Sequence, residues 1–273
     1  MMPTMTISGP RGGIAVSRLA IGGNPFSGIS HQSHERDIEM RDYFTIARIK
    51  ETLAACEAHG VTLFFGRADN HIMRMLHEYW NGGGKIRWFA QTAPERRSLA
   101  ENIRQAAGNG ASAIYIHGGT AKDFRVAGDW AGFAEAVALI RSLGIPAGSA
   151  THEPDLHAAR RASGVTLDFC LQCVYSLEGR RGKIDTHDAG EKFVDDDRLP
   201  ALEALAASPE PTFAYKVLAA GRKMPQEALV DVVRHLRPKD GILMGMCPDR
   251  NPAMVAQNAA LVERLLTRTR KTA

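Results

Sequence analysis

The stretch ACEAHGVTLFFGRADNH, residues 55–71, contains a complete passage from a helix to a strand and into a second helix. Gly60 follows the first helical pattern at the stop position, where a left-handed residue is tolerated. The apolar run at residues 61–65 contains the β-branched and aromatic side chains that favour strands. Asp69 and Asn70 then supply side chains that can cap the N-terminus of the following helix. The stretch therefore predicts one strand between two helices.

The same alternation continues along the whole chain. Strand-like runs lie at residues 18–21, 61–65, 86–90, 113–116, 146–148, 167–172, 212–217 and 241–244. Helical patterns lie at residues 45–59, 70–80, 98–107, 130–143, 154–162, 199–207, 226–236 and 252–267. Strands that alternate with helices in this way form a parallel sheet, and eight units suit the roughly 250 residues of a closed (β/α)8 barrel. We therefore predict an α/β fold, a TIM barrel in which residues 1–273 form a single domain.

Three segments fall outside this repeat. Residues 4–17 read as two short strands around Gly-Pro and Gly-Gly, which predicts a hairpin that closes the N-terminal mouth of the barrel. The connections at residues 22–42 and 175–197 are unusually long, and both follow strands. They therefore belong to the C-terminal face, where barrel enzymes build their active sites. Loops of this length are typically functional, and we expect both to act as lids.

The composition is that of an ordinary globular protein. The chain is 44% hydrophobic and 23% charged, with a formal net charge of +4. No apolar run approaches the roughly 20 residues that span a bilayer, and the N-terminus lacks the pattern of a signal peptide. The basic residues are scattered, whereas a nucleic-acid binder gathers them with aromatics in one stripe. We expect a cytoplasmic protein that binds a small molecule and neither membrane nor nucleic acid, while the oligomeric state is left open.

Cys170 and Cys173 form a C-x-x-C motif, which in other settings indicates redox activity or zinc binding. Here the motif lies in FCLQCVY, an apolar run that reads as a strand. Strand alternation would point the two thiols to opposite faces. A redox C-x-x-C normally opens a helix, where the thiolate is stabilised. We therefore interpret the two cysteines as buried structural thiols.

Six motifs, in order along nearly the whole chain, resemble the aldo-keto reductases. They are VSRLAIGGNPF at 16–26, the stretch 55–71, YIHGG at 115–119, FCLQCVYSLEGR at 169–180, FAYKVLAAG at 213–221 and MGMCPDRNPAMVAQNAALV at 244–262. The resemblance implies the same barrel. It also implies reduction of carbonyl groups with NAD(P)H by a tyrosine, a lysine, an aspartate and a histidine.

The chain departs from this family at its catalytic residues. Aligning FFGRADNH on the family motif places Gly66 at the aspartate and His71 at the tyrosine, and aligning WFAQTAPE places Gln91 at the lysine. Of the four, the histidine alone remains, as His117. The lost tyrosine is the proton donor, and the lysine tunes its pKa. We predict that His71 and His117 point into one mouth and act as a catalytic pair, with Gln91 beside them.

The cofactor contacts that the resemblance implies are mixed. Gln172 and Tyr215 fall where the family contacts nicotinamide. The family's Ser-Asn pair is Ala150-Thr151 here, and Arg250 alone lies near the place of the residues that grip a 2′-phosphate. No G-x-G-x-x-G motif follows a strand, so nothing supports a Rossmann fold. NAD(P)(H) and a divalent metal both stay open as cofactors.

His152 and Glu153 stand just beyond the fifth predicted strand. Either could complete a three-ligand metal site with His71 and His117. The string HEPDLH is not the zinc motif H-E-x-x-H, because Pro154 interrupts the helix that the motif needs. A looser role of His152 and Glu153 in binding at the barrel mouth is the alternative.

Asn24, Asp69 and Lys216 complete the candidate binding residues. Asn24 follows the glycine pair of the first strand, and Asp69 follows the second strand. Lys216 could form a Schiff base if desolvation lowers its pKa. Alternation puts Tyr215 and Lys216 on opposite faces, so both can face the mouth only if Lys216 lies past the strand end. Otherwise the lysine points outward or contacts a phosphate.

These residues favour an enzyme that uses a histidine pair, with or without a metal, for acid–base chemistry. Isomerisation or elimination on a small, sugar-like carbonyl or hydroxyl substrate would suit imidazoles that titrate near neutral pH. One alternative is an NAD(P)H-dependent oxidoreductase in which His71 replaces the tyrosine acid. Another is a barrel without catalytic activity that binds a small ligand.

Overall fold

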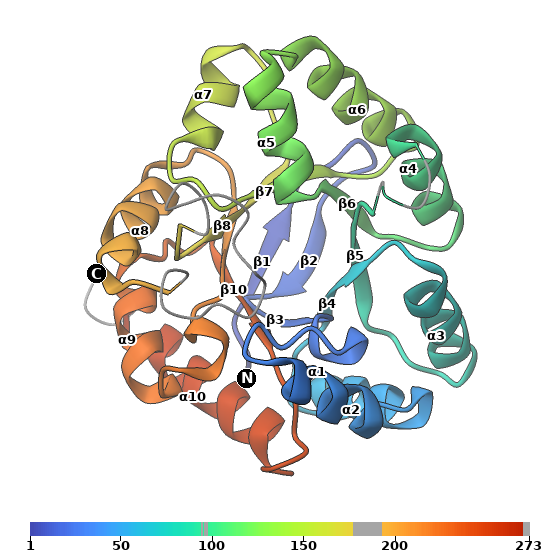
Figure 1. The fold of residues 1–273 in the computed structure, drawn as a ribbon, viewed down its shortest axis with the longest axis vertical. Helices are drawn as coiled ribbons and strands as arrows, with labels where there is room; N and C mark the ends of the chain where they lie inside the picture. Colours follow the sequence, from blue (N-terminus) through green and yellow to red (C-terminus); the bar gives the residue numbers. More distant parts are fainter. Residues whose placement is uncertain (94, 96–97, 177–192, 270–273) are drawn as a thin grey trace.

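The computed structural model describes residues 1–93, 95, 98–176 and 193–269. Its centre is a closed barrel of eight parallel strands, in which the last strand pairs with the first (Figure 1). The predicted TIM barrel is therefore confirmed. Its strands are β3 (Leu19–Gly22), β4 (Leu63–Arg67), β5 (Arg87–Gln91), β6 (Ala113–Ile116), β7 (Ala147–Thr151), β8 (Phe169–Cys173), β9 (Thr212–Tyr215) and β10 (Gly241–Gly245).

An outer ring of helices covers the barrel (Figure 1). The predicted helices are all present, with their ends displaced by a few residues. Each buries the apolar stripe that its sequence pattern provides, as α3 does with Ile72, Leu76 and Tyr79. They are α2 (Ile46–Ala58), α3 (Asn70–Asn81), α4 (Leu99–Gly108), α6 (Trp130–Ser142), α7 (Leu156–Ala162), α8 (Arg198–Ala207), α9 (Pro225–His235) and α10 (Met254–Thr269).

Two helices were not predicted from the sequence. Helix α1 (His34–Tyr43) takes up the second half of the long connection predicted at 22–42 and ends one residue beyond it, and Met40 is its single buried residue. Because its other side chains are mostly charged, the segment has no apolar periodicity to reveal it. Helix α5 (Gly118–Ala127) opens with two glycines, which have low intrinsic helix propensity. Contacts with the rest of the protein, and not the local sequence pattern, therefore determine that these two segments are helical.

The N-terminal hairpin is confirmed as an antiparallel pair, β1 (Thr4–Ile7) with β2 (Ile14–Ser17). Ser17 exchanges hydrogen bonds with Thr62, just before β4. Gly9 lies against Pro146, just before β7. Both contacts are at the N-terminal ends of barrel strands, so the hairpin closes that mouth as expected.

Aromatic rings fill the barrel interior. The ring centroid of Phe65 lies 4.9 Å from that of Phe213, 5.4 Å from Phe89 and 5.5 Å from Tyr115. Phe169 lies 5.1 Å from Phe89. Rings at these separations pack edge-to-face or tilted, as aromatic side chains prefer. The interior below the C-terminal mouth is therefore a packed core and not a channel.

Gly148 makes room for one of these rings, and Gly148→Ala is expected to destabilise the fold. A Cβ at this position would lie 2.5 Å from a ring carbon of Phe169. Overpacking of this kind costs about 1–3 kcal/mol. Urea unfolding should show the loss, whereas Gly108→Ala should show none, because a Cβ there meets no atom within 4 Å. Equal stability of the two variants would contradict this account.

Cys170 and Cys173 lie on β8, and both are free and buried. Burial raises the pKa of the Cys170 thiol to about 12 and that of Cys173 to about 11. Thiols that stay protonated at neutral pH are poor nucleophiles and metal ligands. The interpretation as buried structural thiols is confirmed. In the part of the chain that the structure describes, no helix has the length and apolar character needed to cross a membrane.

Candidate functional site

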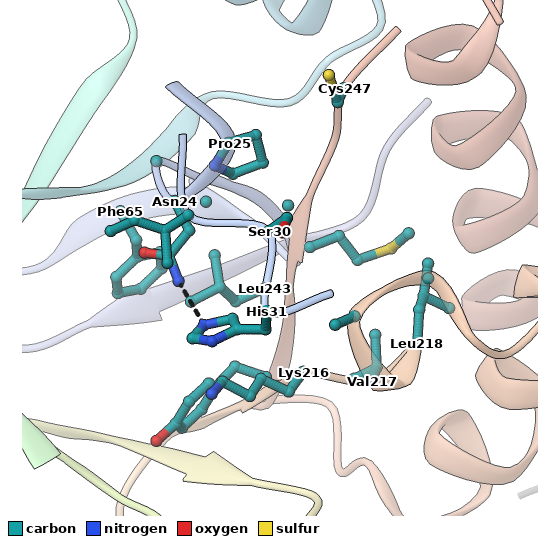
Figure 2. Close-up of a pocket in the computed structure, with 18 of the residues that line it drawn as sticks. Asn24, Pro25, Ser30, His31, Phe65, Lys216, Val217, Leu218, Leu243 and Cys247 are labelled. Atoms are coloured by element: carbon teal, nitrogen blue, oxygen red, sulfur yellow. Dashed lines mark hydrogen bonds between the residues drawn. The ribbon is translucent and has the colours of Figure 1, made fainter. Parts of the chain in front are cut away.

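A cavity of about 680 Å³ opens at the C-terminal ends of the barrel strands. Its floor is made by strand ends, and residues of α10 line one of its walls. Residues of the segment before α1 and of the β9–α9 connection line the others (Figure 2). This is the face at which TIM-barrel enzymes place their active sites. Of the predicted site residues, the structure brings together around this cavity Asn24, Gln91, His117, His152, Tyr215 and Lys216.

Four side chains form the cavity floor on neighbouring strands. Arg67 pairs in register with Gln91, and Gln91 pairs with Tyr115. Residues that are in register on parallel strands share a face of the sheet, so all three side chains point into the barrel. His117 follows Tyr115 by two residues and keeps the same face. The four side chains line one region of the cavity.

His117 is the N-cap residue of α5, and its Nδ1 accepts a hydrogen bond from the backbone N–H of Gly119 at 3.2 Å. An accepting Nδ1 carries no proton. The neutral imidazole therefore holds its proton on Nε2 and can donate it to an oxygen atom. The backbone of α5 thus selects the tautomer of His117.

His152 stands beside His117 at the end of the next strand. A Cβ at Gly118 would lie 3.3 Å from the His152 ring, so the glycine allows this ring to approach the start of α5. The His152 ring centroid lies 5.7 Å from that of Tyr215. The Tyr215 hydroxyl donates to the carbonyl of Thr151 at 2.9 Å, which fixes the tyrosine across the mouth.

Lys216 lies one residue past the end of β9 and adopts a left-handed conformation with φ of 59°. The alternation of the strand no longer applies there. Tyr215 and Lys216 therefore both line the cavity, and the possibility that the lysine points outward is excluded. Non-glycine residues in this region of φ and ψ are strained, and such strain clusters at functional sites.

The segment before α1 is fastened over the cavity. The Asn24 amide and His31 Nε2 are 3.3 Å apart (Figure 2). Gln32 donates to the carbonyl of Ala220 at 2.6 Å, and Arg222 donates to the carbonyl of His31 at 3.1 Å. The connection at 22–42 thus covers the mouth in contact with the β9–α9 connection. Most of the second expected lid, at 175–197, lies outside the described residues.

The expected pairing of His71 with His117 is wrong. His71 is exposed on the first turn of α3 and does not line the cavity. Asp69, just before it, caps α3 by accepting from the backbone N–H of Ile72 at 3.0 Å. The cap turns the chain away from the mouth as soon as β4 ends. The segment thus caps a helix, and the structure does not place His71 at the mouth.

Gln172 and Glu153 are also outside the cavity lining. Gln172 is buried behind β8, in register with Thr151 rather than with the inward Ala150, and its amide donates to the carbonyl of Cys173. Glu153 forms an ion pair with Arg125 at 2.7 Å. The implied nicotinamide contact of Gln172 and the expected place of Glu153 at the mouth are therefore not formed.

The three-ligand metal site that the sequence left open is not assembled among the described residues. Residues 1–93, 95, 98–176 and 193–269 contain no group of three or more His, Cys, Asp or Glu side chains able to hold an ion. The reason is the separation of the proposed ligands, because His71 lies on α3 and Glu153 is held by Arg125. His117 and His152 remain at the mouth.

Sequence reasoning missed Arg67 and Tyr115 as cavity residues, whereas His31 was expected as a contact of the lid segment. The signal for Arg67 was present, because it lies two residues after the inward Phe65. The alignment on the family motif drew attention to Gly66 instead. A Cβ at Gly66 would lie 3.2 Å from Ile72 of α3, so this position faces the helices and not the barrel.

The second histidine of HEPDLH, His157, lies behind β8 and gives a pH-dependent stability. Burial lowers the pKa of His157 to about 4, from 6.5. As the pH falls from 6.5 towards 4, His157 binds its proton in the unfolded chain before it does so in the folded protein. The free energy of unfolding therefore falls, by about 3 kcal/mol at pH 4. Urea unfolding between pH 7.5 and pH 4 should show this loss. His157→Gln, whose amide can still donate to the carbonyl of Leu171, should lose less stability over the same pH range. An identical pH profile for the two proteins would show that His157 is not the cause of the loss.

No protein-family model matches the sequence, and no curated protein matches it. Solved structures match it at low identity. A truncated 3-deoxy-D-arabino-heptulosonate 7-phosphate synthase from Thermotoga maritima is 15% identical, with 95% of this chain and 89% of that chain covered and a TM-score of 0.54. An N-acetylneuraminic acid synthetase from Leptospira borgpetersenii is 11% identical, with coverage of 98% and 90% and a TM-score of 0.55.

A glycerol dehydrogenase from Gluconobacter oxydans is 15% identical over 79% of this chain and 64% of that chain, with a TM-score of 0.47. The likeness to the synthase and the synthetase shows the barrel fold alone, since such barrels support many unrelated reactions. The resemblance to the aldo-keto reductases stays a prediction.

Proposed function

We propose that this protein is an enzyme that moves a proton at the carbon beside a carbonyl group of a small molecule. The arrangement of His117 and His152 at the cavity floor carries the proposal. Both rings stand at the ends of neighbouring strands, on the inward face, within one cavity. A proton donor for an oxygen atom and a base for a carbon atom are the two parts that such a reaction needs.

The two histidines have different roles in this proposal. His117 donates from Nε2 to the substrate oxygen and stabilises the negative charge that develops there. His152 takes the proton from carbon, and returns it to the same or a neighbouring carbon. An imidazole is suited to this work because it gains and loses its proton near neutral pH. Isomerisation and elimination share this first step.

Exchange of carbon-bound protons in D₂O tests the proposal without knowledge of the product. A panel of small aldehydes, ketones, oxo acids and sugar phosphates is incubated with the protein, and loss of the ¹H signal beside the carbonyl is followed by NMR. We expect exchange in at least one compound and its loss in His152→Ala. Absence of exchange across the panel, or undiminished exchange in the variant, would overturn the proposal.

A second candidate, an NAD(P)H-dependent oxidoreductase, is favoured by the shape of the cavity. Its lining continues from Tyr215 at the mouth to Gln257 and Asn258 on α10, which suits a long ligand such as a dinucleotide. NAD(P)H would supply the reducing electrons, with Tyr215 and Asn258 as its contacts at the two ends. Gln172 fits this function poorly, because its amide is turned away from the cavity.

Titration with NADH and NADPH, followed by nucleotide fluorescence, separates the two candidates. Binding below the millimolar range with consumption of NAD(P)H on an added carbonyl compound favours the oxidoreductase. Binding of neither nucleotide excludes it. Binding of a compound from the panel without exchange or reduction would indicate a barrel that binds a ligand and has no catalytic activity.

A further inference from the structure

We infer that Arg67, Gln91 and Tyr115 form a carboxylate-binding subsite at the deep end of the cavity, and that the substrate is a short oxo acid or hydroxy acid. The inference rests on the proposed function for the position of the reacting carbonyl. It adds the chemical class of the molecule that carries this carbonyl.

The three residues form one cluster because of the strand register. They lie on the neighbouring strands β4, β5 and β6, paired Arg67 with Gln91 and Gln91 with Tyr115. Tyr115 is 3% exposed and lies at the bottom of the cavity. The side chain of Arg67 is 25% exposed and reaches the same cavity from the strand end. The cluster is thus open to a ligand from one side.

Arg67 is held in a fixed orientation. Its Nε lies 3.5 Å from Asp69 Oδ2, and its Nη2 forms an ion pair with Glu95. Asp69 is itself fixed by the backbone N–H of Ile72 at the start of α3. A guanidinium whose planar fork is already oriented loses little freedom when it binds a carboxylate, and the paired geometry favours this anion.

Gln91 and Tyr115 add neutral hydrogen-bond donors. Burial raises the pKa of the Tyr115 phenol well above its usual value. The Gln91 side chain is hydrogen-bonded to this phenol, which lowers the pKa of the phenol by a smaller amount. The hydroxyl therefore keeps its proton at neutral pH and can donate to an anion. The three residues thus supply donors and one cation, and the acids beside them, Asp69 and Glu95, are both paired with Arg67.

The charge of the cavity wall also favours an anionic ligand. Among the described residues that line the cavity there is no Asp or Glu, whereas Arg36, Arg67, Lys216, Lys223 and three histidines are present. Arg36 is paired with Asp249 and Lys223 with Asp195, and neither of these two acids lines the cavity. A carboxylate that leaves water needs compensating partners. The described wall of this cavity supplies them, and it offers no carboxylate to bind a cationic substrate.

The position of His117 limits the size of the substrate. Tyr115 and His117 are two residues apart on one face of the same strand, so their backbones are separated by about 7 Å. A carboxylate held by Arg67 and Tyr115 places a carbonyl or hydroxyl oxygen at His117 when the two groups are two or three bonds apart. Short 2-oxo, 3-oxo and hydroxy acids have this spacing.

Glu95 gives the inference a second, opposite test. Its carboxylate is half exposed and already pairs with Arg67, so it competes with a bound anion. Removing the charge of Glu95 should strengthen binding, whereas removing the charge of Arg67 should weaken it. A residue that merely stabilised the fold would not produce this pair of opposite effects.

The test is calorimetric titration of the full chain with pyruvate, acetoacetate and lactate, and with pyruvamide and acetone as uncharged matches. We expect at least one acid to bind more tightly than its uncharged match. Arg67→Gln should weaken the binding of this acid roughly 10- to 100-fold, and Arg67→Lys should weaken it less. Glu95→Gln should bind it more tightly. Arg74→Gln, an exposed arginine on α3, should bind it as the unchanged protein does.

Equal affinity for acids and uncharged matches, or unchanged acid binding in Arg67→Gln, would overturn the inference. Thermal unfolding of each variant shows whether it is folded, and Glu95→Gln tests the subsite even where Arg67→Gln is unstable. Failure of the proposed function is distinguishable, because acids would then bind in an Arg67-dependent way while no proton exchange occurs.

Discussion

His117→Ala is expected to slow proton exchange beside the substrate carbonyl by about 10²- to 10⁴-fold, the range typical of a lost acid–base group. His71→Ala is expected to leave the rate unchanged. The difference arises because His117 ends β6 with its ring in the cavity, whereas His71 is exposed on α3. The rates are measured by ¹H NMR in D₂O on the compound of the panel that exchanges fastest.

The two histidine variants form a matched pair. Both remove one imidazole, and neither removes a buried side chain, so both should fold. Equal losses in His117→Ala and His71→Ala would contradict the placement of α3 and restore the expected histidine pair. A loss in neither variant would remove His117 from the reaction and leave the fold unaffected.

Glu210→Gln is expected to lower the free energy of unfolding by about 3–5 kcal/mol. Glu210 Oε1 accepts from Nη2 of Arg160 at 2.7 Å, and the side chain of Arg160, a residue of α7, is fully buried. The amide would leave this guanidinium charge buried without a counter-charge. Arg161 also pairs with Glu210, at 3.2 Å, but it is partly exposed and water screens its charge.

Urea unfolding with a double variant separates charge from packing. Arg160→Met combined with Glu210→Gln removes the buried cation together with its partner, so it should be less destabilised than Glu210→Gln alone. Glu203→Gln, on the exposed side of α8, is the control and should have little effect. If Glu210→Gln lost less stability than the double variant, the buried ion pair would not be the cause.

Much of the fold was predictable from local patterns. The apolar strands, the glycines that follow helices and the hairpin turn at residues 4–17 all act over short distances along the chain. The sequence of eight such units then leaves closure of a parallel barrel as the solution that covers every strand. Helices α1 and α5 were missed because a mostly charged surface and a pair of glycines carry no helical signal.

The candidate site was predictable only in part. His117 and His152 were found because each stands at the end of a predicted strand, where the chain must meet the barrel mouth, and Tyr215 was found through the resemblance to the aldo-keto reductases. Arg67 and Tyr115 were missed because their role depends on which face of the strand points inward. A strand has a period of two, so an alignment displaced by one residue reverses that face. Gly66 was therefore assigned the inward place that belongs to Arg67.

The sequence by itself determined the barrel, its hairpin, the buried thiols and the strand ends at which polar side chains gather. The tertiary structure alone decided which of these side chains meet. It turned His71 outward through the cap of α3, bound Glu153 to Arg125 and brought Arg67, Gln91 and Tyr115 into register. The physical reason is that secondary structure follows from neighbours in sequence, whereas a site depends on register between strands far apart in the chain.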